Sequence, residues 1–239
     1  MFRNRTEAGK LLGNALAPFK GGETIVLAIP GGGVPVGREI AKILGTDLDV
    51  IVTRKIGAPG NPEFAIGSVT QDGQTLADRN LLDELQVSRE YLEKEAKLEV
   101  ENIRRRLELY RGKRPYPRLD GKTAIICDDG IATGSTMKAA VQSVRKMNAS
   151  RIIVAVPVGP SGTIAELSKS VDKVVCLMTP VNFYSVGDYY GEFEHVGDNK
   201  VRDILAGMGC DAVQGYALAR PMNAAVVPEW LNEWSSRHA

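Results

Sequence analysis

The run from Ala124 to Thr136 constrains the fold more than any other part of the chain. It begins with the apolar residues Ala-Ile-Ile-Cys, continues with the adjacent acids Asp128 and Asp129, and ends in a turn rich in Gly, Ser and Thr. A helical pattern begins at Met137. A strand, two acids, a turn and a helix in this order predict a cradle for a sugar phosphate. Backbone N–H groups and hydroxyls bind phosphate at a helix N-terminus, while carboxylates bind sugar hydroxyls or a divalent cation.

Two other interpretations of this run explain less of it. An ordinary strand–turn–helix junction uses one acid as a helix cap. It does not explain a second acid together with Thr133, Ser135 and Thr136. A phospho-acceptor site of the haloacid-dehalogenase type needs another aspartate two positions after the first, and position 130 is glycine. The sugar-phosphate interpretation is therefore preferred.

Strands and helices are predicted to alternate along the chain. Apolar, β-branched runs indicate strands at 24–29, 48–53, 124–127, 151–157 and 173–178. Helical patterns indicate helices at 6–19, 36–44, 137–147 and 163–169. This alternation is typical of an α/β fold with an open, mostly parallel sheet flanked by helices. Such a sheet carries its ligand-binding loops at the carboxyl ends of the strands.

The segment 54–111 departs from this alternation. Residues 54–62 contain two Gly and two Pro and are expected to form a loop. A hairpin is expected around Asp72-Gly73, between the runs 64–69 and 74–77. Residues 88–111 form a long, highly charged helical pattern with a narrow apolar stripe, which predicts a solvated helix packed on one side.

The acidic run resembles, over its whole length, the phosphoribosyl pyrophosphate (PRPP) motif of type I phosphoribosyltransferases. The segments 54–67, 128–134 and 183–190 resemble an uncharacterised subgroup of predicted phosphoribosyltransferases, and the resemblance covers about residues 1–206. It implies the type I fold with a small hood, to which the long charged segment 88–111 adds a helical insertion unlike the compact orotate and adenine enzymes of the family. It also implies transfer of 5-phosphoribosyl from PRPP to a nucleophile, with release of pyrophosphate.

The resemblance implies roles for three groups of residues. The ribose hydroxyls would be held, directly or through Mg²⁺, by the acids Asp128 and Asp129. The 5′-phosphate would be bound by Ala132, Thr133, Gly134, Ser135 and Thr136. Pyrophosphate would be bound by the residues that follow the first two strands, which are Gly31, Gly32, Gly33, Arg54 and Lys55. The expected catalytic residues are Asp128, Asp129, Arg54 and Lys55, with the loop 56–62 as a lid.

The acceptor substrate is not identified by the sequence. Enzymes that salvage 6-oxopurines usually carry an acid at the position of Ala132, so this residue argues against hypoxanthine or guanine. A hood would supply the acceptor pocket, with Val158, Phe183 and Tyr184 as candidates. Aromatic rings there either stack on a base or simply pack the hood. A non-catalytic sensor of PRPP or nucleotides, and a hydrolase of such ligands, are the alternative functions.

The bulk composition limits the classes of partner. The 239 residues carry a formal net charge of +1, so no global basicity points to nucleic acid, and no apolar run is long enough to span a membrane. Two of the three cysteines lie in apolar runs, which fits a reducing compartment. A cytoplasmic location and small-molecule substrates are expected, and a homodimer is left open.

The last 33 residues have a different character. Part of the segment 207–239 resembles the final strand, turn and helix of EAL-type cyclic-di-GMP phosphodiesterase domains. The Glu-Ala-Leu signature and the acidic metal ligands of that domain are absent from the chain, so no phosphodiesterase activity is expected. A chance similarity of a short segment is the alternative. The predicted organisation is a phosphoribosyltransferase domain at 1–206, with its hood built from the N-terminus and about residues 180–206, and an appendage at 207–239.

Overall fold

The computed structural model of the chain describes residues 1–21, 23–70, 73–77, 79–112 and 114–208. The predicted C-terminal appendage therefore lies outside the described residues, except for Gly207 and Met208. None of the helices in the described part of the chain has both the length and the apolar character that crossing a bilayer requires.

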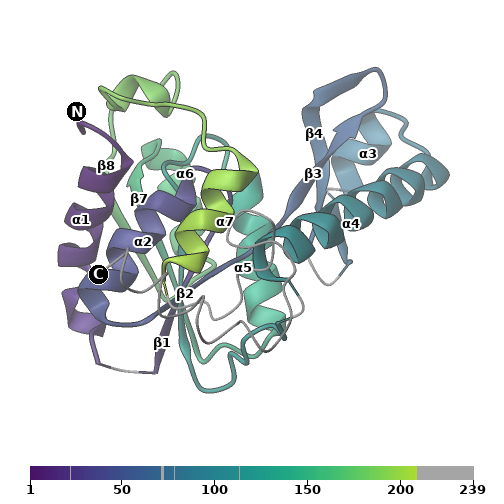
Figure 1. The fold of residues 1–239 in the computed structure, drawn as a ribbon. Helices are drawn as coiled ribbons and strands as arrows, with labels where there is room; N and C mark the ends of the chain where they lie inside the picture. Colours follow the sequence, from purple (N-terminus) through teal and green to yellow (C-terminus); the bar gives the residue numbers. More distant parts are fainter. Residues whose placement is uncertain (22, 71–72, 78, 113, 209–239) are drawn as a thin grey trace, which may run out of the picture.

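A parallel sheet of five strands forms the centre of the molecule (Figure 1). Its strands are β1 (Thr24–Ala28), β2 (Asp47–Val50), β6 (Thr123–Cys127), β7 (Arg151–Val158) and β8 (Lys173–Met178). They lie in the order β2-β1-β6-β7-β8, and every neighbouring pair is parallel. The chain leaves β1 toward β2 on one side and later adds β6 on the other side. The order of the strands thus reverses between β1 and β6, where α/β sheets open a crevice for ligands.

Helices cover both faces of this sheet. One face carries α1 (Arg5–Ala15), α2 (Gly33–Leu44) and α7 (Asp198–Ala206), and the other carries α5 (Ser135–Lys146) and α6 (Ser161–Ser168). Alternate strand residues enter the two cores, with Val26 and Ile125 on the first face and Leu27 and Ile126 on the second. Because both faces are buried, the inner strands β1, β6 and β7 are almost entirely apolar, as the sequence predicted.

The segment inserted between β2 and β6 contains a second, antiparallel sheet. It consists of β3 (Arg54–Ala58), β4 (Asn61–Val69) and β5 (Thr75–Ala77), followed by α3 (Arg79–Glu84) and α4 (Arg89–Arg111). Short 3₁₀ turns occur elsewhere, at Ala17–Phe19 and Gly187–Tyr189. The hairpin expected around residue 73 is confirmed by the antiparallel pairing of β4 with β5.

The expectation of a loop at 54–62 is wrong, because this segment forms the hairpin of β3 and β4. Ala58 pairs with Asn61, so Pro59 and Gly60 alone form the turn. Gly60 has a φ of +76°, and proline before such a glycine suits a tight turn. The Gly and Pro residues that suggested a flexible loop therefore serve a two-residue turn between strands. The preceding strand, β2, also ends at Val50, earlier than predicted.

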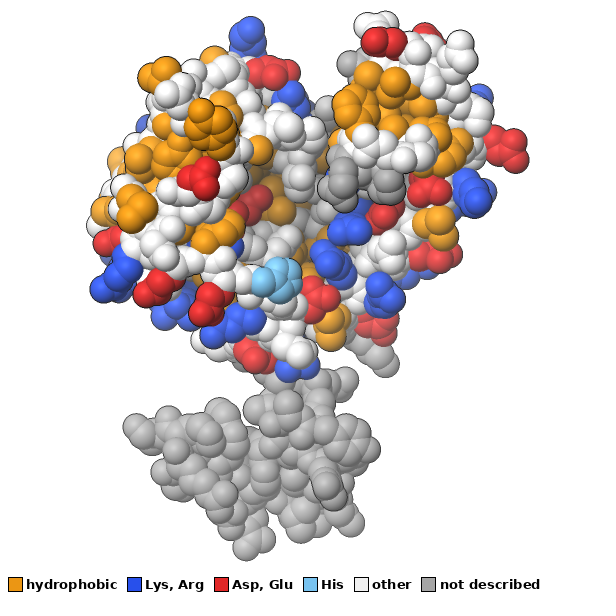
Figure 2. Space-filling model, turned by 90° about the horizontal axis from the view of Figure 1, so that it is seen from above, with side chains coloured by type: hydrophobic (Ala, Val, Ile, Leu, Met, Phe, Trp, Pro, Cys, Tyr) orange, Lys and Arg blue, Asp and Glu red, His pale blue; other side chains and the backbone are white. Residues whose placement is uncertain are grey.

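The insertion projects from the sheet, and the surface is hollowed between them (Figures 1 and 2). The helix α4 buries Ala96, Ile103 and Tyr110, which recur every seven residues and confirm the predicted packing on one side. Its carboxyl end is anchored to α7, because Tyr110 Oη donates to Oδ1 of Asp198 at 2.5 Å. This contact fixes the insertion to the helices on the first face of the parallel sheet.

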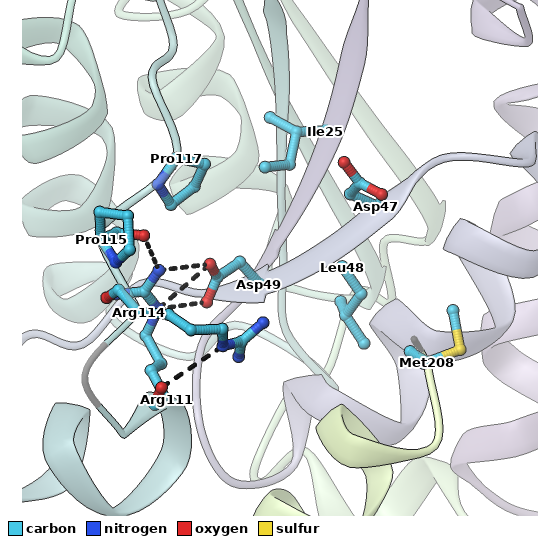
Figure 3. A pocket seen from close by; sticks show the side chains of 9 residues that line it. All are labelled: Ile25, Asp47, Leu48, Asp49, Arg111, Arg114, Pro115, Pro117 and Met208. Atoms are coloured by element: carbon cyan, nitrogen blue, oxygen red, sulfur yellow. Dashed lines mark hydrogen bonds and ion pairs between the residues drawn. The ribbon is translucent and has the colours of Figure 1, made fainter. Parts of the chain in front are cut away.

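The outer edge of β2 is covered by the connector after α4 (Figure 3). The Arg111 guanidinium donates to both carboxylate oxygens of Asp49, and Tyr116 Oη donates to the carbonyl oxygen of Val50 at 2.6 Å. A pocket of about 340 Å³, lined partly by Arg111, Asp49 and Met208, lies beside this ion pair. These contacts occupy polar groups of an edge strand that could otherwise pair with another chain.

The hood joins the N-terminal residues to the segment that precedes α7. Phe2 N–H donates to the carbonyl oxygen of Tyr189, and Gly191 N–H donates to that of Phe2. The rings of Phe2 and Tyr190 lie 5.5 Å apart. The helix α7, which was expected to belong to the hood, instead packs on α2 and α4. The hood is thus limited to the N-terminal residues and the segment before α7.

Candidate active site

The two acids lie directly after the central strand β6. The backbone N–H of Asp129 donates to Oδ1 of Asp128 at 2.8 Å, which folds the first carboxylate back over the turn. Burial, and then the negative charge of Asp129, raise the pKa of the Asp128 carboxyl well above its ordinary value. A cation or hydroxyl donors at this position would relieve the repulsion between the two carboxylates.

The glycine loop follows the neighbouring strand β1. Its Pro30–Gly31 peptide bond is cis. A Cβ built on Gly32 would stand 1.8 Å from Oδ2 of Asp129, and one on Gly33 would stand 3.0 Å from Cα of Asp128. Gly33 is already the first residue of α2, three residues before the predicted start of that helix. Glycine is thus required for the backbone to approach the acids.

The turn between the acids and α5 has the features of a phosphate site. Gly134 adopts a φ of +78° and precedes the first helical residue, Ser135. No side chain caps this helix, and Thr133 and Thr136 are exposed. The hydroxyls of Thr133 and Ser135 lie 3.2 Å apart. Together with N–H groups at the N-terminus of α5, these hydroxyls can bind an anion.

The basic pair begins the first strand of the insertion. The residue before it, Thr53, contacts the first turn of α5 through a hydrogen bond from Oγ1 to the carbonyl oxygen of Thr136 at 3.4 Å. Arg54 Nε donates to Glu99 on α4 at 2.8 Å, and Lys55 is exposed. Arg54 thus holds the insertion together in this structure. A role of either residue toward pyrophosphate stays a prediction.

The three candidates for the acceptor pocket lie in different surroundings. Val158 is buried, and one of its methyl groups lies 3.2 Å from a Cβ built on Gly130. Phe183 stacks on Tyr189 with the ring centroids 5.7 Å apart. Tyr184 is 87% exposed. These aromatic contacts agree with rings that pack the hood, and the acceptor assignment stays a prediction.

Two residues at the site were not singled out from the sequence. Arg5 Nε donates to Oδ2 of Asp129 at 2.7 Å, although the two residues are 124 positions apart. Tyr190 Oη donates to the carbonyl oxygen of Asp129 at 2.6 Å. Burial and then the charge of Asp129 raise the pKa of Tyr190, which keeps its phenol a donor. The sequence placed both residues in hood segments but gave no signal for these contacts.

A divalent cation fits the site as a companion of the ligand. Within the described residues, no three His, Cys, Asp or Glu side chains come together to hold a metal. The Asp128–Asp129 pair supplies carboxylates only. Mg²⁺ is commonly bound by one or two carboxylates together with substrate phosphates and water. This donor set therefore fits a cation that arrives with a phosphorylated ligand.

Comparisons with known proteins identify the family of this chain. Residues 4–190 match the model of the phosphoribosyl transferase domain family. Two curated relatives from Mycobacterium tuberculosis, strains CDC 1551 and H37Rv, are provisionally named phosphoribosyl transferases. Each is 36% identical over 233 residues, which cover 98% of this chain and 52% of the relative. This chain thus spans about half the length of these relatives.

Two further similarities extend the comparison. The crystal structure of TT1426 from Thermus thermophilus is 41% identical, has a TM-score of 0.75, and covers 87% of this chain and 98% of its own. A ribose-phosphate pyrophosphokinase from Pyrococcus furiosus is 39% identical over 71 residues, 28% of this chain and 25% of that protein. The expected type I α/β fold is confirmed by the sheet topology and these similarities. The chain belongs to the phosphoribosyl transferase domain family.

Proposed function

We propose that this protein transfers 5-phosphoribosyl from PRPP to a nucleophile and releases pyrophosphate. The observation that carries the proposal is the contact between the two loops at the sheet switch point. Gly32 lies so close to Asp129 that a Cβ would overlap its carboxylate. A loop suited to pyrophosphate and an acid suited to ribose hydroxyls are thereby adjacent, as a ligand containing both groups requires.

Each part of PRPP has a matching group of residues in this proposal. The 5′-phosphate binds at the N-terminus of α5, where Thr133, Ser135 and Thr136 add hydroxyls. The ribose hydroxyls bind Asp128 and Asp129. The name of the Pyrococcus furiosus relative, ribose-phosphate pyrophosphokinase, combines the same two groups.

The proposed reaction exchanges one bond at the anomeric carbon of ribose. The bond to the pyrophosphate oxygen breaks, the bond to the incoming nucleophile forms, and the proton of the nucleophile is released. The Gly31–Gly33 loop binds the leaving pyrophosphate, and the acids orient the ribose. Orientation and stabilisation of the leaving charge are the main contributions that such residues can make. Mg²⁺ bound with the ligand would supply further positive charge toward pyrophosphate.

The acceptor is expected to enter from the hollow between the hood and the insertion (Figure 2). Ala132 is exposed beside the phosphate turn and carries no acid. The proposal therefore disfavours 6-oxopurines as acceptors, because enzymes that salvage these bases usually carry an acid at this position. Other bases and amines are the acceptors to examine first.

The proposal is tested by titrating PRPP and Mg²⁺ calorimetrically and then measuring pyrophosphate release with a panel of bases and amines. Release that depends on one acceptor is the expected result. Asp129→Asn should abolish release while the variant still folds, although loss of the ion pair with Arg5 lowers its melting temperature. Asp83→Asn, an exposed acid on α3, is the matched control and should retain activity.

Three outcomes would contradict the transferase proposal. Binding of PRPP without release for any acceptor would instead support a sensor. Release at the same rate without an acceptor would support a hydrolase. Near-normal transfer by Asp129→Asn would remove the assigned role of this carboxylate.

A further inference from the structure

Arg5 connects the hood to the acidic pair. Its Nε donates to Oδ2 of Asp129 at 2.7 Å, and its Nη1 donates to the carbonyl oxygen of Glu194 at 2.7 Å. The side chains of Arg5 and Asp129 are only 11% and 14% exposed, so water and salt screen this ion pair weakly. One planar guanidinium therefore spans the hood backbone and the carboxylate of the site.

Aromatic rings of the hood support the Arg5 guanidinium. Its central carbon lies 3.9 Å from the ring centroid of Phe193 and 6.0 Å from that of Tyr190. The two rings also contact each other, with centroids 5.1 Å apart. Tyr190 in turn donates to the carbonyl oxygen of Asp129. The hood thus contacts both the backbone and the side chain of this acid.

These contacts fix the direction of the Asp129 carboxylate. Oδ2 accepts the hydrogen bond from Arg5 and lies so close to Gly32 that a Cβ built on this glycine would stand 1.8 Å from it. Because a carboxylate is planar, fixing Oδ2 and the backbone also fixes the direction of Oδ1. A lysine at position 5 could supply the charge, but its ammonium lacks the planar fork that reaches two acceptors at once.

We propose that Arg5 is a positioning residue that orients Asp129 for the ribose hydroxyls of the ligand. The inference rests on the proposed function and adds to it a residue of the hood on which ribose recognition depends. Pyrophosphate recognition at Gly31–Gly33 should depend on Arg5 much less, because that contact is made by backbone groups of another loop.

The experiment compares two partial ligands by calorimetry. Ribose 5-phosphate has the sugar hydroxyls, whereas inorganic pyrophosphate with Mg²⁺ lacks them. In Arg5→Met, the affinity for ribose 5-phosphate should fall about tenfold, the order expected when one charge-assisted hydrogen bond is lost. The affinity for pyrophosphate should stay within about twofold of wild type. Arg5→Lys should recover part of the loss.

Arg3→Met is the matched control, because it removes the same charge from an exposed position two residues away. It should leave both affinities unchanged. If Arg5→Met lost affinity for both ligands to the same extent, the inference would be overturned, since this would indicate general disruption of the hood. Unchanged binding of ribose 5-phosphate by this variant would overturn it as well.

Crystal structures of the wild type and of Arg5→Met supply a readout that needs no ligand. The Asp129 carboxylate should turn away from Gly32 in the variant, and the same orientation in both proteins would overturn the inference. Failure of the wild type to bind either partial ligand would count against the proposed function. The orientation of Asp129 in the two crystal structures would still decide the role of Arg5.

Discussion

Arg111 and Asp49 form a buried ion pair at the edge of the parallel sheet, 62 positions apart in the chain. Arg111 Nε lies 2.9 and 3.1 Å from the two carboxylate oxygens, and Nη2 lies 3.0 Å from Oδ2. The guanidinium also donates to the carbonyl oxygens of Arg114 and Pro115. The pair therefore joins the end of α4 and its connector to β2.

Arg111→Met should destabilise the protein by about 3 kcal/mol, because it leaves the Asp49 carboxylate buried without its partner. Unfolding in urea measures this loss. Arg118→Met, at an exposed position of the same connector, should change the free energy of unfolding by less than about 0.5 kcal/mol. The double variant Asp49→Leu/Arg111→Met should recover part of the stability, and no recovery would argue against an uncompensated charge as the cause.

Gly32→Ala should weaken binding of PRPP and Mg²⁺ by at least about tenfold, because the new methyl group meets the Asp129 carboxylate. Calorimetric titration measures the affinity. Gly162→Ala is the matched control, since a Cβ there meets nothing within 4 Å. Equal affinities in the two variants would show that the close approach of Gly32 to Asp129 has no functional importance.

Asp128→Asn should stabilise the folded protein at neutral pH. The pKa of Asp128 is raised in the folded state, so its favourable contribution is complete only below the ordinary aspartate pKa. That contribution is lost as the pH rises through the folded-state pKa. Asparagine avoids the loss because its side chain does not ionise. The melting-temperature difference between variant and wild type should be positive at pH 8 and shrink toward zero near about pH 4. A difference independent of pH would contradict this linkage.

A comparison of Gly134→Ala with Gly121→Ala separates the cost of backbone strain from the cost of a steric clash at Gly134. Both glycines have similar positive φ angles, +78° and +76°, so each alanine should cost about 1 kcal/mol of stability. Only at Gly134 would the Cβ also meet a neighbour, Thr163 Cγ2, at 2.8 Å. Urea unfolding should show the larger loss for Gly134→Ala, and calorimetry with PRPP should show weaker binding for this variant alone. Equal losses would mean that Thr163 adjusts without cost.

Local patterns in the sequence predicted the sheet and the loops that follow its strands. The five parallel strands were predicted from apolar, β-branched runs bounded by turn residues, although the edge strand β2 also contains Asp47 and Asp49. The acidic pair and the glycine loop were recognisable because each follows a predicted strand directly in the sequence, and must therefore lie at the carboxyl end of that strand. That these strands are neighbours, with Gly32 against Asp129, required the tertiary structure.

The wrong prediction of a loop at 54–62 has a physical origin in the residues that turns require. Gly57, Pro59 and Gly60 suggested a mobile loop, yet strand pairing on both sides of Pro59-Gly60 produced a hairpin. Glycine and proline favour the dihedral angles of a turn, and they do so both in a long loop and in a two-residue turn. Only the pairing partner distinguishes the two, and it was not visible in a local window.

The sequence by itself determined the α/β alternation, the acids at 128 and 129, and the Gly-, Ser- and Thr-rich turn before α5, because hydrophobic period and turn residues act locally. The tertiary structure alone decided that Arg5 is the partner of Asp129 and that Arg54 pairs with Glu99. Such contacts join segments far apart in the chain. Their partners are chosen by the packing of the hood and the insertion around the sheet, which no local pattern of residues specifies.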